Sequence, residues 1–160
     1  MCLSSIYRGD GEVEYPPLLQ GLTAAQYREH FERTYCCGPV DTFDGIAVRF
    51  RRRDFNHAFF ESSSPKHKDD LFSIQRAEHI DWIKATLQDP DADLYVGYDN
   101  KKKRTVHNRR VAIVKGCYVV IIALTGSHSA VFITAFISHG PAPGRLLSTV
   151  DLIRREPKWA

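Results

Sequence analysis

Residues 110–138 read RVAIVKGCYVVIIALTGSHSAVFITAFIS, and this stretch decides the fold. It holds three runs rich in β-branched and aromatic residues, at 110–114, 117–124 and 130–138, joined by short connections that contain glycine. Connections this short join antiparallel neighbours. A fourth run of the same kind, 94–98, precedes them. The sequence therefore predicts four antiparallel strands that follow one another in chain order.

Helical patterns come before these strands. Thr23 and Gln26 have the spacing of a capping box, which predicts the start of a helix that ends before the Cys-Gly-Pro at 37–39. The other predicted elements are a strand at 46–50, a helix at 54–60, a helix at 73–88 and a C-terminal helix at 145–154. This order predicts an α+β fold, with N-terminal helices packed on one face of a four-stranded antiparallel sheet.

The composition is that of an ordinary folded domain, with 43% hydrophobic and 26% charged residues. No apolar run approaches the ~20 residues of a membrane span. The first residues lack the basic region and apolar core of a signal peptide, so we expect a cytoplasmic protein. None of the 4 cysteines forms a Cys-x-x-Cys motif, and free thiols in a reducing compartment are expected.

The net charge is only +3, but the basic residues are clustered. One cluster lies at 49–53, and another at 101–115 contains no acidic residue. Clustered basic residues are typical of a surface that binds a phosphate backbone, although a solvated loop has the same composition. The candidates for such contacts are Arg51, Arg52, Arg53, Lys101, Lys102, Lys103, Arg104, Arg109 and Arg110.

A single arginine interrupts the apolar stripe of the helix predicted at 73–88. Arg76 is in line with Ile80, Ile83 and Leu87 at helical spacing. A guanidinium in such a place is costly to desolvate unless it is paired. Two interpretations follow: Arg76 binds a phosphate group, or it pairs with an acid of the same chain such as Glu61.

The last predicted strand has a similar interruption at Thr134. Simple alternation puts Thr134 on one face with Phe132 and Phe136. Breaks of a local pattern are expected at functional sites, so Thr134 is a candidate donor of a hydrogen bond to a phosphate oxygen. The alternative is that threonine is present here for its β-propensity alone.

The sequence contains no His-Glu-x-x-His, no acidic calcium loop, no paired-cysteine ligand set and no phosphate-binding glycine loop. We therefore expect no metal and no cofactor. The remaining histidines, arginines and lysines suit metal-free cleavage of RNA. In that reaction the ribose 2′-OH is the nucleophile, and the protein must move two protons and stabilise charge on the phosphorane.

Two histidines compete for the proton-transfer role, because imidazole titrates near neutral pH. His57 is the first candidate, since it lies close to the basic run at 51–53. His79 is the alternative, three residues after Arg76 and so on about the same helical face. Glu61 is a further candidate, either as a general base or as the residue that orients His57.

Four motifs contain these candidates. They are Asp54-Phe55-x-His57-x-Phe59-x-Glu61, Arg76-Ala77-Glu78-x-Ile80-x-Trp82-Ile83, Leu87-x-Asp89-Pro90 and Phe132-Ile133-Thr134-Ala135-Phe136. With them, residues 46–139 resemble the barnase, EndoU, colicin-tRNase and RelE-like (BECR) nuclease superfamily, in particular its phage-associated and polymorphic-toxin branches. Residues 1–45 carry no such resemblance.

The resemblance implies a toxin-like ribonuclease domain at 46–160, preceded by an arm and helix of unknown role at 1–45. It implies a metal-independent endoribonuclease that is held in check by an antitoxin or immunity protein. Attack by the 2′-OH, as described above, leaves a 2′,3′-cyclic phosphate, and tRNA or mRNA is the expected kind of substrate. By motif, His57, Arg76 and Thr134 fall in the expected active site. The alternative is a non-catalytic module on the same fold that binds RNA or another protein.

Overall fold

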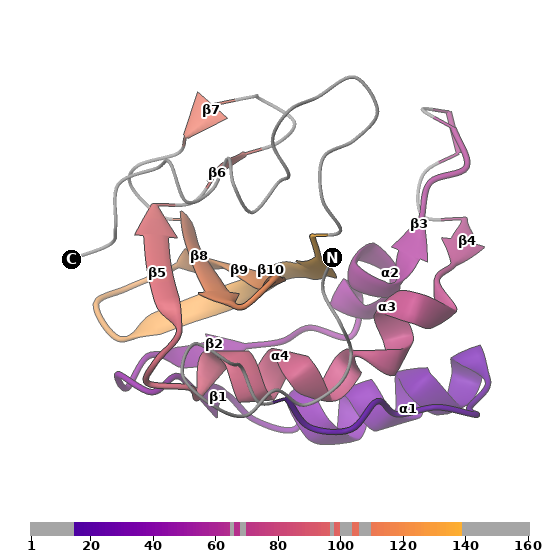
Figure 1. Cartoon of the computed structure of the whole chain (residues 1–160), viewed down its shortest axis with the longest axis horizontal. Helices are drawn as coiled ribbons and strands as arrows, with labels where there is room; N and C mark the ends of the chain where they lie inside the picture. The colour runs from indigo at the N-terminus through magenta and orange to yellow at the C-terminus, as the bar shows by residue number, and fades with distance from the viewer. Residues whose placement is uncertain are drawn as a thin grey trace.

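The computed structural model describes residues 15–64, 66–67, 70–96, 98–99, 104–105 and 110–138, and within them the chain is α+β (Figure 1). The helices are α1 (Ala24–Tyr35), α2 (Asp54–Phe59), α3 (Ile74–Glu78) and α4 (Ile80–Leu87). The strands are β1 (Val40–Asp41), β2 (Ala47–Arg49), β3 (Phe60–Glu61), β4 (Leu71–Phe72), β5 (Asp93–Val96), β6 (Tyr98–Asp99), β7 (Arg104–Thr105), β8 (Arg110–Lys115), β9 (Tyr118–Leu124) and β10 (Ser129–Ile137).

The main sheet has six described strands in the order β1-β2-β10-β9-β8-β5. Its β5, β8, β9 and β10 pair antiparallel in chain order, as the sequence predicts. The prediction of a purely antiparallel four-stranded sheet is wrong, because β2 pairs parallel with β10 and β1 adds a further strand beyond it. β2 is only three residues long, and its partner lies far along the chain, so no local pattern reveals the pairing.

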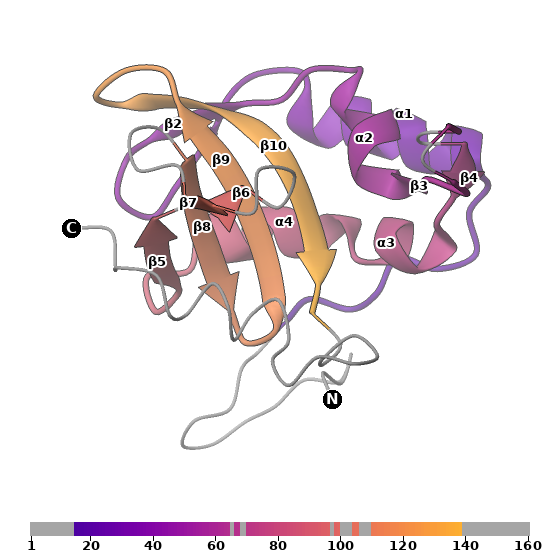
Figure 2. The same ribbon diagram turned by 90° about the horizontal axis from the view of Figure 1, so that it is seen from above.

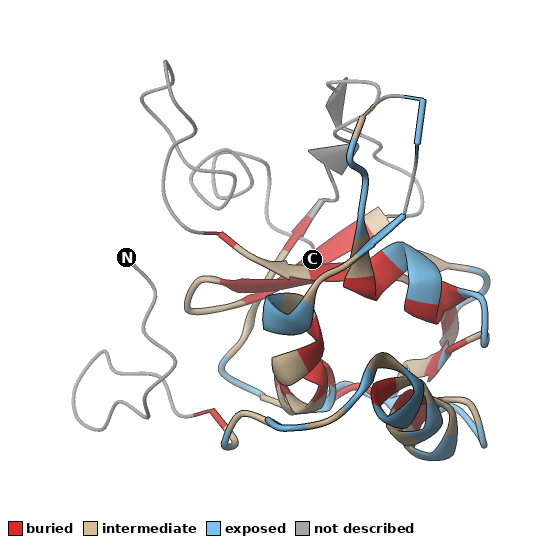
Figure 3. Cartoon of the chain, turned by 90° about the vertical axis from the view of Figure 1, so that its right-hand side faces the viewer, coloured by how far each residue is buried: buried red, intermediate tan, exposed pale blue. Residues whose placement is uncertain are grey.

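The helices share one apolar core with the sheet. Helix α4 lies below β8 and β9, and α2 packs against β10 (Figures 1 and 2). Figure 3 shows buried residues gathered between these layers. The capping box of α1 is confirmed, since Thr23 Oγ1 accepts from Gln26 N and Gln26 Oε1 accepts from Thr23 N. The apolar face of α1 buries Tyr27, Phe31 and Tyr35 in the core.

Alternate strand residues form a second, smaller apolar cluster. It consists of Tyr95, Ala112, Val114, Val119 and Ile121, with Ile133 and Phe136 packed beside it. The predicted C-terminal helix at 145–154 and most of the basic loop at 101–109 lie outside the described residues, where only the backbone of β7 is placed. Among the described residues, no helix has the length and apolar character to cross a membrane.

The expectation of free thiols is confirmed for Cys36 and Cys37 and is wrong for Cys117, which is disulfide-bonded. Cys117 lies in the turn before β9, not inside a strand. Disulfides are typical of oxidising compartments, so this bond does not favour the cytoplasmic location expected from the sequence. Burial raises the pKa of the Cys36 thiol to about 11, and a neutral thiol is a poor nucleophile.

A largely buried ion pair joins the end of α4 to the sheet. Lys115 Nζ lies 2.5 Å from Asp89 Oδ2, and the two side chains are only 11% and 19% exposed. Burial alone raises the pKa of Asp89, but hydrogen bonds from Lys115 and from the Asp91 backbone outweigh it and lower the pKa below its usual value. The Asp89-Pro90 motif therefore has a structural role here.

We expect Asp89→Asn to lower the free energy of unfolding at pH 7 by about 3 kcal/mol, because it leaves a buried ammonium without its anion. Since the folded pKa of Asp89 lies below the unfolded value of about 4, its contribution is present above that pH and is lost as pH falls through the folded pKa. Urea unfolding between pH 7 and pH 2 measures this. The gap between wild type and variant should shrink with acid, while exposed Asp91→Asn leaves the curve unchanged. A gap that stays constant to pH 2 contradicts the prediction.

Candidate active site

A pocket of about 140 Å³ lies where α3 meets the ends of β3, β9 and β10. It is lined by Glu61, Gln75, Arg76, His79, Tyr118, Ala135, Phe136 and Ile137. The pocket therefore brings together a carboxylate, a guanidinium and an imidazole, all three of which are candidates from the sequence. β2 pairs with β10 only from Ser129 to Val131, so the pocket lies along an edge of the described sheet.

Arg76 is placed by the cap and the core face of α3. Ser73 Oγ accepts from Arg76 N at 3.3 Å and starts the helix, and Ala77 faces the core. The Arg76 side chain is one-third exposed, with Nη1 3.4 Å from the Ala58 carbonyl oxygen and Nε 3.4 Å from Glu61 Oε1. The intramolecular pair that the sequence offered as an alternative is therefore present. The guanidinium also lines the pocket, so the pair with Glu61 does not prevent Arg76 from binding a phosphate group.

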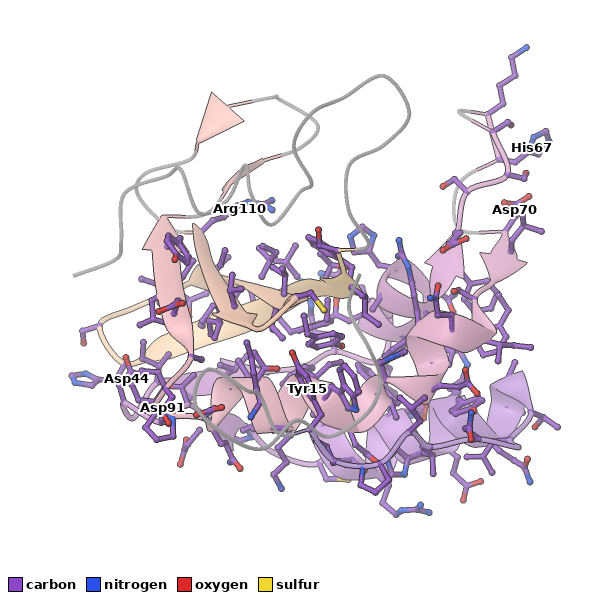
Figure 4. The ribbon with its side chains drawn as sticks, viewed as in Figure 1. Tyr15, Asp44, His67, Asp70, Asp91 and Arg110 are labelled. Carbon is purple, nitrogen blue, oxygen red and sulfur yellow. The ribbon has the colours of Figure 1, made fainter. Side chains whose placement is uncertain are left out.

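Glu61 reaches Arg76 because the chain makes a hairpin between them. β3 pairs with β4, with Glu61 opposite Leu71, and α3 begins directly after β4. At the base of the hairpin, the Asp70 carboxylate accepts from the Ser63 hydroxyl and backbone N–H, and these hydrogen bonds lower the pKa of Asp70. Figure 4 shows His67 and Asp70 on this protruding hairpin.

His79 breaks the helix that the sequence predicts from 73 to 88. In a continuous helix its N–H would bond to the Gln75 carbonyl. Here the Gln75 carbonyl oxygen accepts a hydrogen bond from the His79 side chain, with 2.5 Å between it and Nδ1. The His79 backbone N–H donates instead to the Arg76 carbonyl oxygen at 3.2 Å. A side chain that inserts into the backbone ladder ends the regular helix. The single predicted helix is therefore wrong, and α3 and α4 meet at His79.

The same hydrogen bond sets the chemistry of the imidazole. A carbonyl oxygen only accepts, so Nδ1 is the donor in this hydrogen bond. His79 is only 4% exposed. Its ring packs edge-on against Trp82 at 4.4 Å and nearly parallel to Tyr118 at 6.3 Å between centroids. The imidazole is thus held in one orientation at the pocket wall.

Thr134 does not line the pocket. A β-bulge between Phe132 and Thr134 shifts the register, so that Thr134 pairs with Ile121. Phe132 belongs to the main core, whereas Ile121 and Phe136 belong to the second cluster. The expectation that Phe132 and Phe136 share a face is wrong because the bulge adds one residue to the alternation. Thr134 lies on the face away from the helices.

His57 and the basic candidates also lie outside the pocket lining. His57 is exposed on α2, next to the Ala58 carbonyl that Arg76 contacts. Arg51 forms a fork with the buried Asp54, with N–O distances of 3.3 and 3.0 Å. Arg52 and Arg53 are exposed, whereas Arg110 lies along the sheet away from the hairpin (Figure 4). Lys101, Lys102, Lys103 and Arg109 are outside the described residues, as is the side chain of Arg104.

Two polar residues of the pocket lining, Gln75 and Tyr118, were not predicted from the sequence. Gln75 flanks Arg76, and its backbone carbonyl accepts the His79 hydrogen bond; any residue at 75 has such a carbonyl, so the sequence carried no signal for the helix break. Tyr118 opens β9 opposite Ile137, and burial raises the pKa of its phenol well above the usual value. Its hydroxyl donates to the His79 carbonyl at 3.4 Å, so it remains a neutral support for the imidazole.

Comparison with profiles of known protein families, with curated proteins and with solved structures finds no match to this chain. Among the described residues, no group of three or more His, Cys, Asp or Glu side chains has the arrangement of a metal site. Proposals about function therefore rest on the pocket itself.

Proposed function

We propose that this protein is a metal-independent endoribonuclease of the BECR type. The observation that carries the proposal is the convergence of Glu61, Arg76 and His79 on one small pocket. Cleavage of RNA by its own 2′-OH requires an acceptor for the hydroxyl proton, a donor for the leaving 5′ oxygen and a cation for the phosphorane. A carboxylate, an imidazole and a guanidinium supply these three functions.

In the proposed reaction, Glu61 accepts the proton of the 2′-OH as its oxygen attacks phosphorus. The bond from phosphorus to the 5′ oxygen breaks, and the protonated His79 gives its Nε2 proton to that oxygen. Arg76 stabilises the negative charge on the non-bridging oxygens, since its planar fork matches them. The products are a 2′,3′-cyclic phosphate and a 5′-hydroxyl. In this assignment His79 takes the acid role for which the sequence had favoured His57.

Incubation of the purified protein with total RNA in excess EDTA tests the proposal. We expect cleavage to continue under chelation, because the proposed groups need no metal. Protein carrying His79→Gln, purified in the same way, should be inactive and so controls for contaminating ribonuclease. Cleavage that is lost with EDTA and restored by magnesium would show that the metal-free reaction is wrong.

The proposal includes a biological role as a toxin. An unregulated endoribonuclease damages its own host, so an inhibitor protein, an antitoxin or immunity protein, is the expected partner beside RNA. Expression of wild type should then arrest growth, whereas Arg76→Gln should not. The exposed Arg52 and Arg53, which precede α2, are candidates for contacts with the RNA backbone outside the pocket.

A second candidate function is a non-catalytic module that binds RNA. The Glu61–Arg76 pair favours it, because a guanidinium already paired with a carboxylate is satisfied without a substrate. RNA binding with steep salt dependence and no cleavage would support this candidate.

A further inference from the structure

The Arg76 guanidinium is loosely held by the protein. Its two described side-chain contacts, to the Ala58 carbonyl and to Glu61, are both 3.4 Å long. Charge-assisted hydrogen bonds of good geometry are about 2.7–2.9 Å. A guanidinium carries five N–H donors, so these two long contacts engage only a minor part of the hydrogen-bonding capacity of a residue that lines the pocket.

The partner of Arg76 is equally easy to move. Glu61 is 52% exposed and lies on the two-residue strand β3 of the β3–β4 hairpin. Exposed ion pairs contribute little free energy, because water and salt screen them. Separating Glu61 from Arg76 therefore costs the fold little. By contrast, Arg51 makes two contacts with the carboxylate of the buried Asp54, and this ion pair is more costly to separate.

We propose that the Arg76 guanidinium is a binding site for one phosphate group, and that Glu61 occupies it in the free protein. The phosphate displaces the carboxylate from the guanidinium, and the released Glu61 then lies beside the bound phosphate as a base. The pocket of about 140 Å³ has room for a single phosphate group. The inference rests on the proposed function for the choice of phosphate and for the second role of Glu61.

Displacement of Glu61 by phosphate couples substrate binding to the release of the base. Glu61 pairs with the cation in the free protein, and the arriving phosphate releases the carboxylate to act as the base. A carboxylate-bearing ligand competes for the same guanidinium and should act as a weak inhibitor. The same residue thus lowers affinity in the ground state and takes part in the reaction.

Titration of the full chain with inorganic phosphate, at constant ionic strength and monitored by amide chemical shifts, tests the inference. Glu61→Gln removes the competing anion and should tighten phosphate binding about two- to fivefold, given the small free energy of an exposed pair. Glu29→Gln is the matched control, because it removes the same charge from an exposed i,i+4 pair with Arg33 on α1. Arg76→Gln should lose saturable binding, and Arg76→Lys should retain part of it.

The inference is overturned if Glu61→Gln binds phosphate no more tightly than Glu29→Gln, or if Arg76→Gln binds as wild type does. Cleavage of RNA in EDTA, measured on the same samples, separates this inference from the proposed function. Tighter phosphate binding by Glu61→Gln with no cleavage by wild type supports the anion site and rejects the ribonuclease. If wild type cleaves RNA but Glu61→Gln binds phosphate no more tightly, the ribonuclease is supported and the anion site is rejected.

Discussion

Replacing Arg76 with glutamine is expected to lower the rate of RNA cleavage by about a hundredfold or more, the usual cost of removing one preorganised donor from a developing oxyanion. The amide keeps a hydrogen-bonding group near the pocket but loses the charge and the fork that stabilise the phosphorane. The fold should be little affected, since the partner Glu61 is half exposed and such pairs contribute about 0–1 kcal/mol. Single-turnover cleavage of a short oligoribonucleotide in EDTA measures the effect.

Arg33→Gln is the matched control for this experiment. It removes the same charge from an exposed position on α1, in an i,i+4 pair with Glu29. Its cleavage rate should equal that of wild type, apart from a small loss of long-range attraction that salt abolishes. Equal rates for Arg76→Gln and Arg33→Gln would show that the pocket is not where cleavage occurs.

Trp82→Ala is expected to have the largest effect on stability. Trp82 is fully buried in α4, stacked on Tyr15 with 3.9 Å between ring centroids, and its Nε1 donates to the Pro16 carbonyl at 2.8 Å. Figure 4 shows Tyr15 lying against this helix. Removing a buried tryptophan costs about 3–5 kcal/mol, which is a large part of the total stability of a small domain. Urea unfolding followed by far-UV circular dichroism measures the loss.

Trp82→Phe separates the two contributions of this side chain. Phenylalanine keeps most of the apolar volume and the stack on Tyr15, but it leaves the Pro16 carbonyl without its donor. We expect a loss of about 1 kcal/mol, the net contribution of one hydrogen bond, because this contact is only partly buried. If Trp82→Ala lowers the free energy of unfolding by less than about 3 kcal/mol, Trp82 does not anchor the segment that contains Tyr15.

Local patterns predicted those parts of the fold that local physics controls. The capping box at Thr23 satisfies backbone groups within its own helix, so its signal is complete in a few residues. The connections between β8, β9 and β10 are also local: each is short, so it determines that the strands on either side pair antiparallel. The parallel pairing of β2 with β10 depends on residues distant in sequence, and nothing within Ala47–Arg49 reveals it.

The errors at the site have a common cause in hydrogen bonds that periodicity does not detect. Alternation along β10 fails at the bulge before Thr134, and the helix predicted at 73–88 ends where the His79 imidazole takes the Gln75 carbonyl. Arg76 and Glu61 were linked correctly, because an unpaired guanidinium on an apolar stripe demands an acid nearby. The preference for His57 rested on nearby basic residues and on the family motif; the structure has His79, and not His57, in the pocket lining.

The most direct test of the central claim compares an oligoribonucleotide with the same sequence carrying 2′-O-methyl groups, both incubated with the full chain in EDTA. If Glu61, Arg76 and His79 promote attack by the 2′-OH, mass spectrometry should find 2′,3′-cyclic phosphate ends from the first substrate and an intact second substrate. Arg76→Gln should release about a hundredfold less of the cyclic product. Cleavage of the 2′-O-methyl substrate, or no cyclic phosphate from the unmodified one, would contradict the account.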